Sequence, residues 1–195
     1  MIIESGTGNG RLVGVTAENQ LNVRAETHSI QHHKSAVDGQ AYQVIGDFAA
    51  VNNATHTILH CTNDNTTKDM VITYIRMQYL DQAGGTTIPA AATYFQIGTG
   101  TAYSSGGSAV TPVNMNTGSG QVSSITSYDN NATVTGTFTE IDRWYPVSDG
   151  DTMTYNKQAS LIIKPGDTVE VRVVSDNTSG VAYSRISYIM TNPGE

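Results

Sequence analysis

The stretch that most constrains the fold is residues 161–174, with the sequence LIIKPGDTVEVRVV. Two runs of strand-forming residues are separated by KPGD, in which proline fixes the φ angle of a turn and glycine tolerates a positive φ. In the second run Val169, Val171 and Val173 recur at every second position, which is the period that buries one face of a sheet. The stretch therefore predicts a strand, a tight turn and a second strand whose three valines face the core.

The rest of the chain repeats this pattern, and signals for helices are nearly absent. β-branched residues and glycine are spread throughout, and no long segment shows the helical spacing of apolar residues between caps. We therefore expect an all-β fold, a jelly-roll-like β-sandwich preceded by an extended N-terminal arm with a short hairpin. The expected strands are residues 11–16, 21–27, 41–48, 56–61, 70–80, 94–99, 110–115, 133–144, 160–163, 169–175 and 183–191.

The first 35 residues are expected to lie outside the sandwich. Residues 11–16 and 21–27 would form a hairpin with few apolar side chains, and an isolated two-stranded ribbon is marginal in water. Residues 27–39 are polar and are expected to be a connector without a helix, whereas apolar residues become dense from Ala41 onward. The chain is thus expected to divide into an arm, residues 1–35, and a β-sandwich domain, residues 36–195.

Composition excludes several classes of function. Charged residues make up 14% of the chain, and ten basic residues stand against seventeen acidic ones, for a net charge of −7. Binding to nucleic acid requires a dense basic face, so no nucleic-acid partner is expected.

The first residues lack the pattern of a signal peptide and no run is long enough to span a bilayer, which predicts a soluble protein without a membrane partner, made in a cytoplasm. The single cysteine, Cys61, is expected to be a small buried thiol.

Three histidines close to one another are the nearest approach to a metal site. His28 and His32 have a spacing that metal ligands use on a helix, and His33 adjoins them. The flanking residues look extended, no glutamate lies between the two, and no third ligand is identifiable. We expect a solvated or packed connector here, and no metal or cofactor.

Acidic and glycine-rich segments do not form a catalytic signature either. Glycine-rich tracts at residues 6–10 and 98–107 are not followed by a helix that could receive a phosphate. The acids nearest to turn residues lack the spacing of a calcium loop or of a glycosidase pair, and they are expected to accept local hydrogen bonds: Asp129, Glu140, Asp142, Asp149 and Asp151. No enzymatic activity is expected.

Two features leave alternatives open. Residues 100–131 are poor in large apolar side chains, which indicates a long loop that is either functional or a mobile surface excursion. A group of aromatic residues would form either a platform for sugars or part of the core and interfaces, and the second is the commoner case. These residues are Tyr94, Tyr103, Tyr128, Trp144 and Tyr145.

Three segments resemble structural proteins of tailed-bacteriophage virions: RLVGVTAENQLNVRAETHSIQHHKSAVDGQAYQV, VTPVNMNTGSGQ and SLIIKPGDTVEVRV. Together they cover much of the chain. The resemblance implies a head decoration, or cement, protein, a β-sandwich that is commonly a homotrimer and sits where major capsid protein subunits meet. It also implies the capsid surface of the virion as the location, after synthesis in the host cytoplasm.

Within that resemblance, the arm supplies the expected contacts. A segment that does not fold alone can reach a neighbour and become ordered on assembly. Arg11 and Arg24 are expected to pair with acidic groups of the capsid, and apolar contacts are expected from Leu12, Val13, Val15, Leu21 and Val23.

Two other functions are alternatives to the decoration of a capsid. One is a tail- or fibre-associated module that recognises a host glycan through residues 100–131 and the nearby tyrosines. The other is a small β-sandwich hydrolase, for which no nucleophile, base and orienting group can be named together. A sandwich fold serves all three roles, so the architecture does not choose among them.

Overall fold

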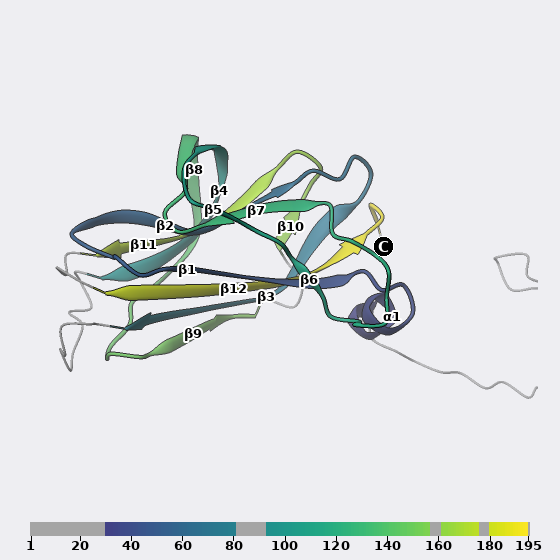
Figure 1. The fold of residues 1–195 in the computed structure, drawn as a ribbon, viewed down its shortest axis with the longest axis horizontal. Coiled ribbons are helices and arrows are strands. Elements are labelled where there is room, and N and C mark those ends of the chain that lie inside the picture. Colours follow the sequence, from purple (N-terminus) through teal and green to yellow (C-terminus); the bar gives the residue numbers. More distant parts are fainter. Residues whose placement is uncertain (1–29, 81–92, 157–160, 176–179, 195) are drawn as a thin grey trace, which may run out of the picture.

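The computed structural model describes residues 30–80, 93–156, 161–175 and 180–194. These residues form one short helix, α1 (Ile30–Ala36), and twelve strands in two antiparallel sheets that pack face to face (Figure 1). The expectation of an all-β sandwich is therefore confirmed. The arm hairpin expected at residues 11–16 and 21–27 lies outside the described residues.

The first sheet has the order β10-β3-β12-β1-β6, and β9 and β10 pair with successive parts of one edge of β3. Its strands are β1 (Ala41–Phe48), β3 (Asp69–Leu80), β6 (Val113–Asn114), β9 (Thr152–Tyr155), β10 (Leu161–Ile163) and β12 (Val181–Thr191). The first and last long strands, β1 and β12, are neighbours over eight residue pairs, from Ala41 opposite Ile189 to Phe48 opposite Ala182. This pairing joins the two ends of the domain.

The second sheet has the order β5-β7-β2-β11-β4-β8. Its strands are β2 (Ala54–Asn63), β4 (Tyr94–Ser105), β5 (Ser108–Val110), β7 (Ile125–Asp129), β8 (Thr133–Trp144) and β11 (Thr168–Ser175). The sequence β1-β12-β3 with β9 and β10 in one sheet, facing β2-β11-β4-β8 in the other, is the strand order of a jelly roll.

The turn before β11 and the strand itself adopt the expected conformation. The amide of Asp167 donates a hydrogen bond of 3.0 Å to the carbonyl of Lys164, and Gly166 has a φ of 83°, so Pro165 and Gly166 are the central residues of a type II turn. Val169, Val171 and Val173 are all 0% exposed. The predicted register of this strand is confirmed.

Helix α1 corrects the expectation of a connector without a helix. The helix packs against β1 and β12. Near it, Ala41, Ile189 and Val71 form a row across β1, β12 and β3 and a small buried cluster apart from the main core. A seven-residue helix is too short to be stable alone, so packing on the sheet supplies the stability that the local sequence does not indicate.

Residues 100–131 correct the expectation of a long loop. Strand β4 continues to Ser105, and β5, β6 and β7 follow within the same stretch. The single strand expected at residues 110–115 is instead divided at Pro112, with β5 in the second sheet and β6 in the first. These strands, and the unexpected β9, are rich in Ser, Thr and Asn, so backbone pairing rather than a dense apolar pattern defines them.

Among the described residues, no helix is long and apolar enough to cross a membrane.

Candidate functional site

The residues predicted to contact a capsid lie outside the part of the chain that the structure describes. This is true of all seven: Arg11, Leu12, Val13, Val15, Leu21, Val23 and Arg24. The described chain begins at α1, on the outer side of the first sheet. The chemistry that the structure does present therefore lies on the faces and edges of the sandwich.

A buried carboxylate occupies the outer face of the second sheet. Glu170 on β11 is 0% exposed and accepts four hydrogen bonds. Its Oε1 accepts from Thr57 Oγ1 at 2.7 Å and from Arg172 Nε at 2.6 Å. Its Oε2 accepts from Thr101 Oγ1 at 2.6 Å and from Arg172 Nη2 at 3.1 Å. With each oxygen bonded twice, this carboxylate is held in place and is not positioned as a catalytic base.

An aromatic ring covers this cluster. The ring of Phe138 on β8 lies 3.8 Å from the Arg172 guanidinium carbon, which is a cation–π contact. The ring also crosses Gly98, where an added Cβ would lie 2.4 Å from Phe138 Cζ. Glycine at this position therefore lets the ring approach the sheet, and the covered ion pair has a structural role.

His60 is the third ionisable group of the cluster. It is 0% exposed, and its Nε2 lies 3.3 Å from the carbonyl oxygen of Thr101, which also accepts a hydrogen bond of 2.6 Å from Thr168 Oγ1. Burial is the main cause that lowers the pKa of His60. In the neutral ring Nε2 carries the proton and donates to Thr101, and Nδ1 has no partner among the described residues.

Sequence reasoning did not single out Glu170, Arg172, Thr57, Thr101 or His60. One signal was available, because Glu170 and Arg172 are two residues apart on a predicted strand and therefore share a face. The threonine donors had no such signal, since Thr57 and Thr101 are 113 and 69 residues away from Glu170.

The five aromatic residues of the candidate sugar platform fall into separate groups. Tyr103 and Tyr128 stack on each other, with ring centroids 3.5 Å apart and planes at 1°. Trp144 stacks on Phe95 and packs against the main core, with ring centroids 5.9 Å apart. The remaining pair, Tyr94 and Tyr145, have ring centroids 5.2 Å apart. The five do not make a single platform.

Arg143 fixes the Tyr94 and Tyr145 group. Its guanidinium carbon lies 4.5 Å from the Tyr94 ring centroid, and its Nη1 donates to the Tyr145 hydroxyl at 3.1 Å. It also donates to both oxygens of Glu140, from Nη2 at 2.6 Å and from Nε at 3.0 Å. These hydrogen bonds lower the pKa of Glu140, which also accepts a hydrogen bond from Gln96.

Of the other acids near turns, Asp151 accepts local hydrogen bonds as expected, whereas the partner of Asp129 is distant in the sequence. Asp151 accepts from the amides of Val147 and Ser148, and these bonds lower its pKa. Asp129 accepts a bond of 3.4 Å from the amide of Asp47, but burial raises its pKa. Within the described residues, no group of three or more histidine, cysteine or acidic side chains is arranged to hold a metal.

Of the three neighbouring histidines, the structure describes two. His32 and His33 lie on α1, and His33 Nε2 is 3.5 Å from Asp38 Oδ1. His28, the other member of the proposed spacing, lies outside the described residues.

A groove of about 550 Å³ lies between β4 and β8 of the second sheet and β10 of the first. Thr99, Thr101 and Thr168 line it together with Ile141 and Ile162, which are 39% and 46% exposed. Strand β8 pairs only with β4, and β10 pairs only with β3, among the described strands. The groove is therefore bordered by two strands that each have an open hydrogen-bonding edge.

No known family model matches the chain, and no curated protein sequence matches it.

Proposed function

We propose that this chain is a non-enzymatic structural protein of a tailed-bacteriophage virion, one that decorates and cements the capsid by binding major capsid protein subunits. In this proposal it acts as a homotrimer on the capsid surface, and the segment before α1 makes the contacts. The observation that carries the proposal is that the sandwich closes on itself without that segment.

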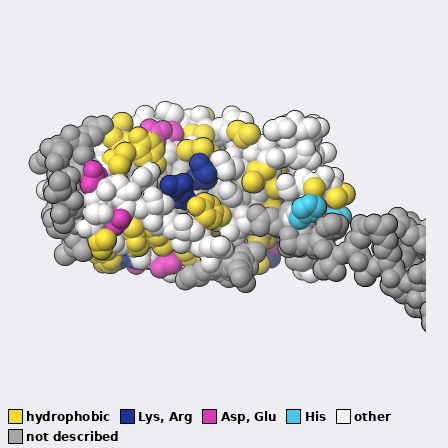
Figure 2. All heavy atoms as spheres, turned by 90° about the horizontal axis from the view of Figure 1, so that it is seen from below, with side chains coloured by type: hydrophobic (Ala, Val, Ile, Leu, Met, Phe, Trp, Pro, Cys, Tyr) yellow, Lys and Arg dark blue, Asp and Glu magenta, His cyan; other side chains and the backbone are white. Residues whose placement is uncertain are grey.

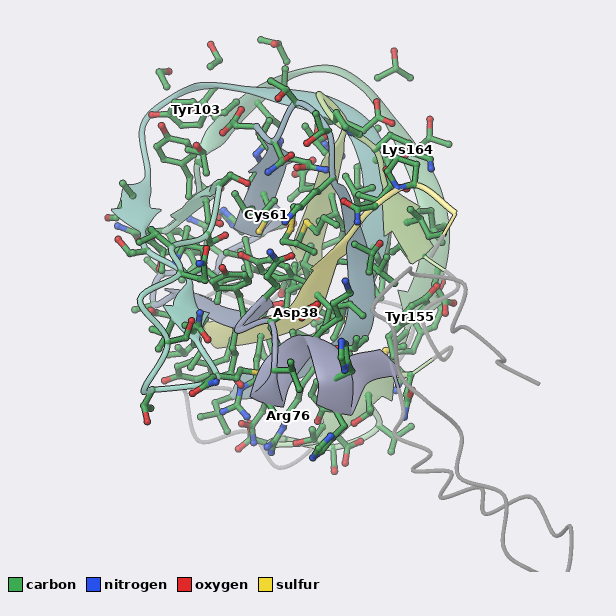
Figure 3. All side chains as sticks on the ribbon, turned by 90° about the vertical axis from the view of Figure 1, so that its right-hand side faces the viewer. Asp38, Cys61, Arg76, Tyr103, Tyr155 and Lys164 are labelled. Carbon is green, nitrogen blue, oxygen red and sulfur yellow. The ribbon has the colours of Figure 1, made fainter. Side chains whose placement is uncertain are left out.

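The closure is visible in the first sheet and in the core. Strands β1 and β12 pair along their length in the centre of the sheet, and the main cluster of buried side chains runs from Tyr42 to Met190. In Figure 3, which looks along the sandwich from the end that carries α1, Cys61 lies between the two sheets. In this proposal residues 1–29 contact the partner, and the apolar side chains between Leu12 and Val23 suit an extended contact.

The groove between β8 and β10 offers a place to receive such a segment. An extended chain adds to an open sheet edge through backbone hydrogen bonds, and apolar pockets beside the edge select its side chains. Ile141 and Ile162 supply the exposed apolar surface of the groove. An arm from a neighbouring copy that lies here would link the copies of a trimer to one another.

The expected mechanism is mechanical stabilisation of the shell. A protein that binds only the expanded shell shifts the equilibrium toward that state by its free energy of binding, multiplied over many sites. The domain suits this role for two reasons. The ion pair between Glu170 and Arg172 stabilises the outer face of the second sheet, and the chain carries few charged residues.

The test removes residues 2–29 and keeps α1, because this helix packs on the sandwich. We expect both the truncated protein and the full chain to unfold cooperatively on heating, but only the full chain to sediment with expanded shells of its own phage. Full-length protein with Val122→Ser is a matched control, since this valine is 82% exposed on the sandwich itself. Saturation of expanded shells by the truncated protein would overturn the proposal.

The homotrimer has its own measurement. Native mass spectrometry of the purified protein and imaging of the particle are expected to find three copies together. The trimer is rejected if both the isolated and the particle-bound protein are monomeric.

The competing function, a tail- or fibre-associated module that recognises a host glycan, has less support at residues 100–131. About half of this stretch is in strands, and the rings of Tyr103 and Tyr128 are stacked on each other. Counting copies in purified particles separates the two functions. Hundreds of copies on the head are expected for a cement protein, and a few at the tail for a recognition module.

A further inference from the structure

The outer face of the first sheet carries two arginines that are direct cross-strand neighbours. Arg76 on β3 lies opposite Arg185 on β12. Such neighbours are about 4.5–5.5 Å apart at Cβ, where like charges repel. Figure 2 shows this face, on which basic side chains gather near the middle and hydrophobic ones border them. In Figure 3, Arg76 lies on the side of the first sheet turned away from Cys61 and the core.

Most of the other described basic side chains are neutralised by a carboxylate. Within the described residues, no carboxylate lies within ion-pair distance of Arg76 or Arg185. Arg76 makes one long hydrogen bond, of 3.5 Å from Nη2 to Thr152 Oγ1. Four basic side chains do pair with carboxylates: Lys34 with Asp38, Arg143 with Glu140, Lys164 with Asp69, and Arg172 with Glu170. In a chain with a net charge of −7, two adjacent arginines without an acid leave a place for an external anion.

The arginines line a hollow of about 200 Å³ together with Gln78, Tyr183 and Ile45. The amide of Gln78 is held by a hydrogen bond of 3.0 Å from Nε2 to the carbonyl of Gly150, so its Oε1 remains the acceptor of this side chain. Tyr183 and Ile45 are 38% and 49% exposed. The walls thus combine two guanidinium groups, an amide oxygen, a phenol and an aliphatic surface.

We propose that this hollow binds an acidic saccharide unit, a sugar ring that carries a carboxylate. Arg76 and Arg185 both line the hollow, and guanidinium N–H groups bind carboxylate oxygens through charge-assisted hydrogen bonds. Gln78 Oε1 accepts a hydrogen bond from a ring hydroxyl, and Tyr183 and Ile45 cover the apolar edge of the ring.

The size of the hollow limits the ligand. Sites for drug-sized ligands occupy about 300–1,000 Å³, so a hollow of about 200 Å³ holds a single small unit. It is nevertheless larger than a carboxylate alone, and its remaining walls are of the kinds that hydroxyl groups and C–H edges contact. A single acidic sugar has a carboxylate, hydroxyl groups and an apolar ring edge, and so it contacts every kind of side chain that lines the hollow.

This site goes beyond the proposed function. It lies on the outer face of the first sheet, away from the groove between β8 and β10, and it is tested on the isolated protein. Failure of saccharide binding therefore leaves attachment to expanded shells unaffected, and the reverse also holds.

The experiment titrates the full-length protein with glucuronate and N-acetylneuraminate, followed by saturation-transfer NMR and calorimetry, with glucose and acetate as comparison probes. We expect at least one of the two acidic sugars to bind about tenfold or more tightly than glucose or acetate. The double variant R76Q/R185Q is expected to lose this binding while remaining folded, because the substitution also removes the repulsion between the arginines. Arg143→Gln, an arginine on the other sheet, is the matched control and is expected to bind as the native protein does.

Three results would overturn the proposal. The first is failure of both acidic sugars to bind, and the second is unchanged binding in R76Q/R185Q. The third is that acetate, or a short oligoglutamate peptide, binds as tightly as the acidic sugars, which would identify a general anion or peptide site instead. Asp47→Asn gives a further check, since Asp47 lies opposite Tyr183 on β1 and loss of its charge is expected to leave saccharide binding unchanged or strengthen it.

Discussion

Arg172 binds both carboxylate oxygens of Glu170, through hydrogen bonds of 2.6 Å from Nε to Oε1 and 3.1 Å from Nη2 to Oε2. Both residues lie on β11, which runs between β2 and β4 in the second sheet. Glu170 is fully buried, so the pair has exchanged hydration for contacts with Arg172 and two threonines. Ion pairs of this kind are sensitive to the loss of one partner, because the other charge is left without compensation.

Glu170→Gln tests this sensitivity. The substitution preserves size but leaves the Arg172 guanidinium without its counter-charge, and we expect the free energy of unfolding to fall by about 3–5 kcal/mol. Urea denaturation monitored by circular dichroism measures it. Glu140→Gln is the control, because Glu140 also pairs with an arginine but is exposed, and its effect is expected to be far smaller. Equal effects of the two substitutions would contradict the assigned role of Glu170.

The pH dependence of stability is expected to report on His60. Burial lowers the pKa of His60 in the folded protein, whereas in the unfolded chain it is about 6.5. Below about pH 6.5 the unfolded chain therefore binds more protons than the folded protein, so the free energy of unfolding decreases as the pH falls. His60→Gln keeps a donor toward Thr101 but does not titrate, and its stability is expected to decrease less between about pH 7.5 and pH 5.5.

The matched control for this experiment is His32→Gln, since His32 is exposed on α1. It shows whether replacing a histidine that is not buried changes the stability in the same way. If native and His60→Gln proteins lose stability in parallel, the titration arises elsewhere.

Gly98→Ala tests the close contact between β4 and β8. The new Cβ would lie 2.4 Å from Phe138 Cζ and 2.6 Å from the carbonyl oxygen of Thr139. The backbone oxygen does not move as readily as a side chain, so we expect a loss of about 1–3 kcal/mol in the free energy of unfolding. Gly120→Ala serves as the comparison, because nothing lies within 4 Å of its added Cβ. A neutral Gly98→Ala would show that the two strands are farther apart.

Cys61 is expected to be unreactive until the protein unfolds. The thiol is 0% exposed, and burial raises its pKa to about 12. The thiolate is the reactive form of cysteine. A thiol reagent such as DTNB at about pH 8 is therefore expected to label Cys61 in the native protein only as fast as the protein unfolds. In denaturant, the same reagent is expected to label this single cysteine immediately. Fast labelling of the native protein would place Cys61 outside the core.

Several elements of the fold follow from local sequence patterns. Strand β11 shows the alternation of Val169, Val171 and Val173, and the turn before it has the Pro165 and Gly166 that a type II turn requires. The bounds of β1 and β8 agree with those expected from the sequence, because each has strand-forming residues between clear turn signals. The arm and its seven contact residues stay predictions, as do the capsid partner and the trimer.

The amino-acid sequence by itself determined that this chain folds into an all-β sandwich, because the period of two and the turn residues are local properties of neighbouring positions. Only the tertiary structure decided which distant residues meet. Helix α1 exists because a sheet face lies beneath it, and the polar strands β5, β6 and β7 exist because partner strands complete their hydrogen bonds. Glu170 meets Thr57 and Thr101, and Arg76 meets Arg185, through strand order and register, which depend on how the whole chain packs.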